Sequence, residues 1–246
     1  MQKTGTTTRT TEKKYTIRLL RDDQNEIEHV WEMVVRNMSR AMISGVTLKG
    51  IRQPLVIAAA FTVFALLYRY LGDFAMSGAI TIVVSVCVCL VNTYYGLYYG
   101  LYSDKLCPEA GQNMFAYYGK ERRRCWVAES DRKIIAAVGI QEKTSTDNSP
   151  DAGQASVAVL QRLVVEPEYR RMGVADALIK TALEFCKEHN YEEVILATSE
   201  VQHDVMRYYY KRGFVEIRHS TFDDLFPLFE LKMHVFRLDL KDGSYQ

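Results

Sequence analysis

Residues 163–175 read Leu-Val-Val-Glu-Pro-Glu-Tyr-Arg-Arg-Met-Gly-Val-Ala and carry the strongest structural signal in the chain. Leu163 to Val165 are apolar and β-prone, and Pro167 ends that run because proline cannot donate to a strand ladder. Residues 174–189 follow with apolar side chains at helical spacing. The stretch therefore predicts a strand, a basic turn and the beginning of a helix.

The predicted turn contains Arg170, Arg171 and Gly173 just before the helix begins. A helix N-terminus has free N–H groups and the positive end of the helix dipole, and glycine lets a ligand approach the backbone. The turn is thus a candidate anion site, although strand–turn–helix units also use such residues for purely structural reasons. The spacing matches neither the dinucleotide fingerprint nor the P-loop.

A second group of residues lies between Ser199 and Gly213. Ser199 to Gln202 fits a capping box that starts a helix, and Gly213 ends it. Gln202 and Tyr209 are seven residues apart, so they would share one face of that helix. Three consecutive tyrosines occupy 208–210, and only one of them can follow the Gln202 face. Packing in the helix core is the alternative role for these rings.

The two groups together resemble the GCN5-related N-acetyltransferase (GNAT) superfamily. Arg170-x-x-Gly173-x-Ala175 is similar to its Gln/Arg-x-x-Gly-x-Gly/Ala signature, and residues 209–214 resemble its Leu-Tyr-Glu-Lys-Leu-Gly-Phe segment. The segments at 125–130 and 184–191, with an apolar hairpin near the N-terminus, resemble the camello (N-acetyltransferase 8-like) group. That group is membrane-anchored, mostly in the endoplasmic reticulum. The resemblance implies transfer of acetyl from acetyl-CoA to the amine of an amino-acid-like small molecule, such as a cysteine S-conjugate.

The resemblance also implies roles for the residues that match the family motifs. The backbone of Leu163 and Val165 would pair with the pantetheine arm of the co-substrate, and Tyr209 would protonate the leaving thiolate. Gln202 stands where the family usually has asparagine, and it would bind the cofactor with a longer side chain. The pyrophosphate would be held by the charge of Arg170 and by the backbone N–H groups of Arg171, Met172, Gly173, Val174 and Ala175.

The acceptor side of the reaction is less defined. Glu166 is a candidate general base, and a water chain is the alternative. Arg162 interrupts an apolar strand, and the aspartate-acetylating relative has an arginine at this place, so Arg162 would bind a substrate carboxylate unless it only faces solvent. Cys125 as an acyl-carrying nucleophile lacks a histidine partner at useful spacing. Acetylation of protein lysines, or an inactive acyl-CoA-binding scaffold, are the alternative functions.

The predicted fold is α+β, with a mixed, largely antiparallel sheet flanked by helices and an inserted hydrophobic helical hairpin. Residues 1–14 are Thr-rich and read as a disordered tail, and 15–48 form a first β-α unit whose helix spans Arg21 to Met38. Residues 49–104 form the hairpin, and 105–246 form the acetyltransferase core.

The hairpin has apolar runs at about 54–71 and 74–101, separated by Gly72-Asp73. Each run reaches the roughly 17–25 residues that a membrane-spanning helix needs, and tyrosines flank both. We therefore expect a lipid bilayer as a partner. A re-entrant hairpin, or the buried core of a soluble domain, are the alternatives. Lys49, Arg52 and Lys105 at the outer ends favour a cytosolic catalytic domain, whereas Arg69 near the tip argues against it.

Composition excludes several other classes. Lys plus Arg total 31 and Asp plus Glu total 30, so no global charge argues for nucleic-acid binding. The five cysteines are odd in number and contain no Cys-x-x-Cys pair, which predicts buried thiols in a reducing compartment and no metal site. The basic cluster Lys120 to Arg124 either touches lipid headgroups or lies in a solvated loop.

Overall fold

One seven-stranded sheet organises the protein. A computed structural model describes residues 15–102, 114–143, 156–221 and 230–241. The strands are β1 (Thr16–Leu19), β2 (Arg124–Ser130), β3 (Lys133–Glu142), β4 (Val157–Val165), β5 (Glu193–Ser199), β6 (Val215–Thr221) and β7 (Lys232–Asp239). They lie in the order β1-β2-β3-β4-β5-β7-β6, and every neighbouring pair is antiparallel except β4 with β5. The predicted mixed, largely antiparallel sheet is confirmed.

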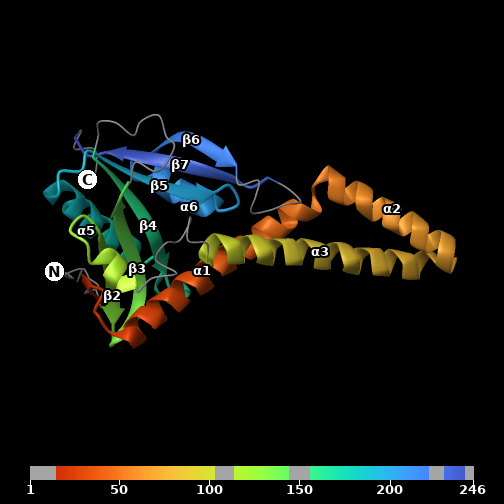
Figure 1. Ribbon diagram of the computed structural model, residues 1–246, viewed down its shortest axis with the longest axis horizontal. Coiled ribbons are helices and arrows are strands. Elements are labelled where there is room, and N and C mark those ends of the chain that lie inside the picture. The colour runs from red at the N-terminus through yellow and green to blue at the C-terminus, as the bar shows by residue number, and fades with distance from the viewer. Residues whose placement is uncertain (1–14, 103–113, 144–155, 222–229, 242–246) are drawn as a thin grey trace, which may run out of the picture.

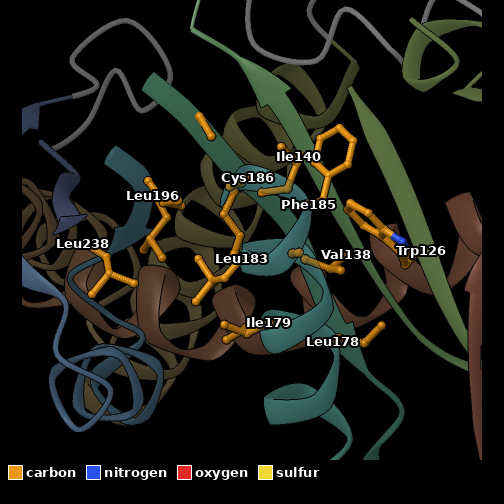
Figure 2. Close-up of a cluster of buried hydrophobic side chains, with 14 of the residues drawn as sticks. Trp126, Val138, Ile140, Leu178, Ile179, Leu183, Phe185, Cys186, Leu196 and Leu238 are labelled. Carbon is orange, nitrogen blue, oxygen red and sulfur yellow. The ribbon is translucent and has the colours of Figure 1, made fainter. Parts of the chain in front are cut away.

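Helices cover both faces of the sheet (Figure 1). Helices α5 (Val174–Glu188) and α6 (His203–Tyr210) pack on one face, and α1 (Gln24–Ile51) and α4 (Met114–Tyr118) pack on the other. Figure 2 shows the core beneath α5, where Leu178, Ile179 and Leu183 meet side chains of the strands. The core beneath α1 joins Val30, Met33 and Val34 to residues of β2, β3 and β4. Each face therefore has its own hydrophobic core.

Helix α1 is longer than the sequence predicted. The expected end at Met38 is wrong, because the helix continues to Ile51 and so passes through the expected boundary at 48/49. Its second half is held by neighbours rather than by an amphipathic pattern: Val46 is fully buried, and the hydroxyl of Thr47 lies 3.0 Å from that of Thr93. Tertiary contacts therefore extend this helix from the sheet to the hairpin (Figure 1).

The hairpin consists of α2 (Pro54–Leu71) and α3 (Phe74–Tyr102). It breaks where predicted: Gly72 adopts φ 68°, and Asp73 caps α3 through its carboxylate, 2.8 Å from the Met76 N–H. The two helices project from the sheet as one arm (Figure 1). No residue of α2 is buried, so the hairpin is not a buried core element of the domain.

The basic cluster is integrated into the fold. Three successive arginines place their guanidinium groups over aromatic rings, at 4.5, 4.5 and 5.5 Å from the ring centroids, in the pairs Arg122–Tyr191, Arg123–Tyr117 and Arg124–Phe185. These contacts give the cluster a packing role. The predicted tail at 1–14 and Cys107 lie outside the described residues, as does most of the predicted polar loop at 142–154.

Candidate active site

The two parallel strands at the centre of the sheet pair only at their beginnings. Val157, Ala158 and Val159 of β4 pair with Glu193, Val194 and Ile195 of β5, and no pair is formed beyond them within the described strands. Both strands continue on their other sides, where β4 pairs with β3 as far as Val165 and β5 pairs with β7 as far as Ser199. The inner edges thus keep backbone hydrogen-bonding groups available to a ligand.

A β-bulge changes the direction of the side chains within β4. The register between β3 and β4 shifts opposite Val138, and Arg162 has φ 57°. Gln161 and Arg162 consequently face the same side: Gln161 donates to the Tyr118 hydroxyl (2.7 Å), and an Nη1 of Arg162 lies 3.8 Å from the Met38 sulfur. The bulge therefore points Arg162 toward α1.

After the bulge, Leu163 and Val165 pack against the α5 core. The N–H of Glu166 donates to the Ile135 carbonyl in β3 (2.8 Å). Because backbone groups alternate along a strand, the N–H groups of Leu163 and Val165 point away from β3, toward the unpaired edge. The predicted pairing of these two residues with an extended ligand is thus geometrically open, except that Arg170 already binds the Val165 carbonyl (3.0 Å).

The turn between β4 and α5 has the features of an anion site. Gly173 caps α5 with φ 78° and no side-chain hydrogen bond, and Arg171 also has a positive φ of 61°. A Cβ placed on Gly173 would meet nothing within 4 Å, so the space before the helix is open. The first N–H groups of an α-helix lack intrahelical partners. The backbone around Val174 and Ala175 therefore fits a phosphate ligand.

Arg170 points in a direction that the sequence did not indicate. Its Nε donates to the Val165 carbonyl, and one Nη donates to the side-chain oxygen of Asn37 in α1, both at 3.0 Å. Arg171 and Met172 are exposed at the turn. Arg170 is also exposed, but its guanidinium is engaged with Val165 and Asn37.

Tyr209 is the buried member of the tyrosine run. Its side chain packs on Phe214 and Phe236, with ring centroids 5.5 and 6.0 Å away. Burial raises the pKa of Tyr209 above its ordinary value of 10.0, because the phenolate would lose its hydration. Tyr208 and Tyr210 donate elsewhere, to Asp176 (2.8 Å) and Glu216 (2.5 Å). Tyr209 is thus a protonated phenol at neutral pH.

Gln202 lies just before α6, which begins at His203. The predicted helix start at Ser199 is therefore wrong, although half of the capping box forms: the Gln202 amide oxygen accepts from the Ser199 N–H (3.4 Å) and from the Thr198 hydroxyl (2.9 Å). Those contacts direct the side-chain amide oxygen of Gln202 toward β5. Gln202 and Tyr209 consequently do not share a helix face, because Gln202 precedes the helix.

Glu166 follows β4 and is held by α1. Its carboxylate forms an ion pair with Arg36 and accepts from the Asn37 amide (3.4 Å). Cys125 lies elsewhere, in the core beneath α1, and is 3% exposed. No group of three or more metal-ligating side chains occurs in the described part of the chain.

The main element that the sequence reading missed is the part of α1 that passes along the site. Asn37 contacts the turn after β4, and Lys49 pairs with Glu200 beyond the end of β5. A signal was present: Asn37 is the polar member of the apolar stripe that includes Val30 and Val34, where an amide needs a buried partner.

Comparisons with known proteins identify the family of this chain. A model of the acetyltransferase (GNAT) family matches residues 91–214. Human N-acetyltransferase 8 is 36% identical over 106 residues, which are 43% of this chain and 44% of that protein. The camello protein of Xenopus tropicalis is 27% identical over 161 residues, or 64% and 68% of the two chains. The matched region thus spans less than half the length of the N-acetyltransferase 8 relatives from human and Rattus norvegicus.

Solved structures with related folds include NAA60 of Arabidopsis thaliana in complex with acetyl-CoA, at 16% identity and a TM-score of 0.42, covering 50% of this chain and 79% of that one. A GNAT-family acetyltransferase of Staphylococcus aureus Mu50 has 19% identity and a TM-score of 0.42, covering 60% and 89%.

Proposed function

Because this chain belongs to the acetyltransferase (GNAT) family, we propose that it is a membrane-bound N-acetyltransferase that uses acetyl-CoA. Its acceptor would be the amine of an amino-acid-like small molecule, such as a cysteine S-conjugate. The observation that carries the proposal is the short pairing of β4 with β5 beside an open, glycine-capped helix N-terminus. Together they offer backbone donors for an extended arm and for a pyrophosphate.

The residues that would hold acetyl-CoA lie on β4 and the following turn. The N–H groups of Leu163 and Val165 would bind the pantetheine amides, and those of residues 171–175 would bind the pyrophosphate. Arg171 would add an exposed positive charge. Gln202, whose carbonyl is already engaged, would offer its amide N–H₂. Bound acetyl-CoA supplies the activated acetyl group.

Tyr209 would act as the general acid. The amine attacks the thioester directly, and a backbone N–H of β4 stabilises the charge that develops on the carbonyl oxygen. Tyr209 then gives its phenolic proton to the thiolate as it leaves. Its raised pKa keeps the proton on the phenol until the thiolate forms beside it.

The amine must lose a proton before it attacks. Glu166 is one candidate base, but its carboxylate is already engaged by the ion pair with Arg36 and the hydrogen bond from Asn37. We therefore favour a water chain. Arg162 would bind the acceptor's carboxylate, because the bulge points it to the α1 side, where its guanidinium lies 6.0 Å from the Trp31 ring centroid.

The hairpin would anchor the enzyme in a bilayer. The 18 residues of α2 make a helix about 27 Å long, close to the roughly 30 Å of a hydrocarbon core. Large apolar side chains are exposed along it, including Leu55 (71%), Phe61 (71%) and Leu66 (66%). Tyr70 near the tip and Tyr94 near the base are also exposed, as residues at membrane interfaces are. Location in the endoplasmic reticulum follows the resemblance, and a cytosolic catalytic domain follows from the basic residues at the outer ends of the hairpin.

The proposal is tested by a product assay with the full chain in lipid nanodiscs. Isotopically labelled acetyl-CoA and a panel of free amines, S-substituted cysteines included, are incubated with the protein, and products are identified by mass spectrometry. We expect a labelled small-molecule amide. Label found only on protein lysines would make the small-molecule proposal wrong. Coenzyme A binding without any labelled product would instead indicate an inactive scaffold.

A further inference from the structure

Asn37 is a buried amide in the middle of α1. It is 4% exposed and lies within the core beneath α1, where an unpaired amide would be costly. Its side chain is fully engaged: Nδ2 donates to the Met33 carbonyl (3.0 Å) and to the Glu166 carboxylate (3.4 Å), and Oδ1 accepts from Arg170 (3.0 Å). An asparagine is a poor helix former, so its presence here indicates that the contact with Arg170 matters.

Arg170 connects this amide to the end of β4. Its guanidinium donates in two directions, to Asn37 and to the carbonyl of Val165. The neighbouring Glu166 is tied to the same turn of α1 through Arg36. Both ends of the short 3₁₀ helix Pro167–Tyr169 are therefore fixed to α1 by side chains.

The turn that follows needs such support. Arg171 and Gly173 both have positive φ, at 61° and 78°. A residue with a side chain costs roughly 1–2 kcal/mol in this left-handed region, so Arg171 keeps it only where its surroundings hold it there. Val174 is buried on the helix side of the turn. On the strand side, the side-chain contact next to the turn is that of Arg170 with Asn37.

We propose that Asn37 is a positioning residue that, through Arg170, holds the turn in the conformation that binds a pyrophosphate. This proposal rests on the proposed function, because it names the residue that shapes the acetyl-CoA site. It also gives Arg170 a geometric role, because its guanidinium hydrogen bonds connect the turn to α1.

The experiment separates geometry from charge. Three variants are compared with the unmodified protein in nanodiscs. Asn37→Leu keeps the size of the side chain but removes the oxygen that accepts from Arg170, and Arg170→Lys keeps the charge but cannot donate to both Asn37 and Val165. Arg171→Gln removes an exposed charge. Coenzyme A binding is measured calorimetrically at low and high salt, and kcat and KM for acetyl-CoA are measured separately. Asn25→Leu and Arg40→Lys, both at exposed sites of α1, are the matched controls.

Asn37→Leu and Arg170→Lys are expected to weaken coenzyme A binding by about tenfold, the scale of a lost buried hydrogen bond. The loss should be equal at both salt concentrations, with kcat at saturating acetyl-CoA changed by less than about twofold. Arg171→Gln should weaken binding mainly at low salt.

Wild-type binding by Arg170→Lys, or by folded Asn37→Leu, would overturn the proposal. If Asn37→Leu does not fold, coenzyme A binding by Arg170→Lys alone tests the proposal. If the unmodified protein itself does not bind coenzyme A, the proposed function is refuted and this proposal falls with it.

Discussion

Gly45 of α1 lies directly against Val201, in the segment between β5 and α6: a Cβ on Gly45 would be 2.7 Å from the Val201 Cβ. The helix that carries the hairpin thus touches the part of the chain that leads to Tyr209. A glycine inside a helix normally lowers stability by roughly 1 kcal/mol relative to alanine, so close approach explains its use here.

The first prediction concerns this contact. Gly45→Ala should lower the free energy of unfolding by about 1–3 kcal/mol, because overpacking outweighs the gain in helix propensity. Gly78→Ala in α3 is the matched control, since a Cβ there would meet only one atom, at 3.9 Å, and that variant should be neutral or stabilising. Thermal unfolding in detergent measures both. Equal effects of the two changes would contradict the prediction.

Tyr209→Phe should lower kcat by roughly 10²–10⁴ while leaving coenzyme A binding unchanged, because it removes only the donated proton. Tyr210→Phe serves as the control, since its hydroxyl binds Glu216. Steady-state release of free thiol provides the measurement. Full activity of Tyr209→Phe would exclude Tyr209 as the general acid.

Glu200 gives a pH dependence of stability. Burial alone would raise its pKa, but hydrogen bonds from Lys49 and from the Lys232 N–H outweigh it and hold the pKa below the ordinary 4.5. A carboxylate with a depressed pKa contributes stability above its unfolded pKa, and that contribution is lost as pH falls through the folded pKa. Melting temperatures between about pH 7 and pH 3 should therefore fall less steeply for Glu200→Gln. Parallel curves for the two proteins would show that the pair has no such role.

Arg162→Gln should raise KM about tenfold or more for acceptors that carry a carboxylate, because a charge-assisted hydrogen bond is lost. The KM for acetyl-CoA should stay unchanged. The control is the same amine with its carboxylate converted to an amide. For this acceptor, Arg162→Gln and the unmodified protein should have the same KM. Equal losses for the two acceptors would indicate a structural role only.

The thiols report on the hairpin. Cys87 of α3 is exposed in the protein structure, whereas Cys89, Cys125 and Cys186 are buried. A maleimide reacts with a thiolate in water, so Cys87 should be protected in nanodiscs and react after the lipid is replaced by denaturant. A Cys107→Ser background removes the remaining thiol. Rapid labelling of Cys87 in nanodiscs would show that α3 does not enter lipid.

A cysteine at the tip distinguishes a spanning hairpin from a re-entrant one. In sealed vesicles, Asp73→Cys should react with an impermeant maleimide only from the side opposite to the catalytic domain. Labelling from the same side as the catalytic domain would favour the re-entrant hairpin.

The parts of the fold that the sequence predicted depend on local patterns. The break at Gly72-Asp73, the strand before Pro167 and the helix after Gly173 each follow from a few neighbouring residues. Non-local packing was not predicted. The second half of α1 packs against α3 and against the segment around Val201. No local pattern within residues 39–51 indicates those contacts.

The same distinction applies to the site. The motif identified Arg170 and Tyr209, but the direction of Arg170 depends on Asn37, which is 133 residues away in the chain. The bulge at Arg162 occurs without a glycine, so no local pattern indicates that this residue adopts positive φ or that it faces α1.

If the hairpin enters a bilayer, the unbroken course of α1 would separate the turn after β4 from the lipid surface. Asn37 precedes Ile51, the last residue of α1, by 14 residues (51 − 37), or about 21 Å along the helix axis. At physiological ionic strength the Debye length is about 8 Å. With the hairpin inserted and α1 along the bilayer normal, an anionic coenzyme would reach the turn beyond the range of negatively charged headgroups. Its capture would therefore be insensitive to the lipid charge of the membrane in which the enzyme resides.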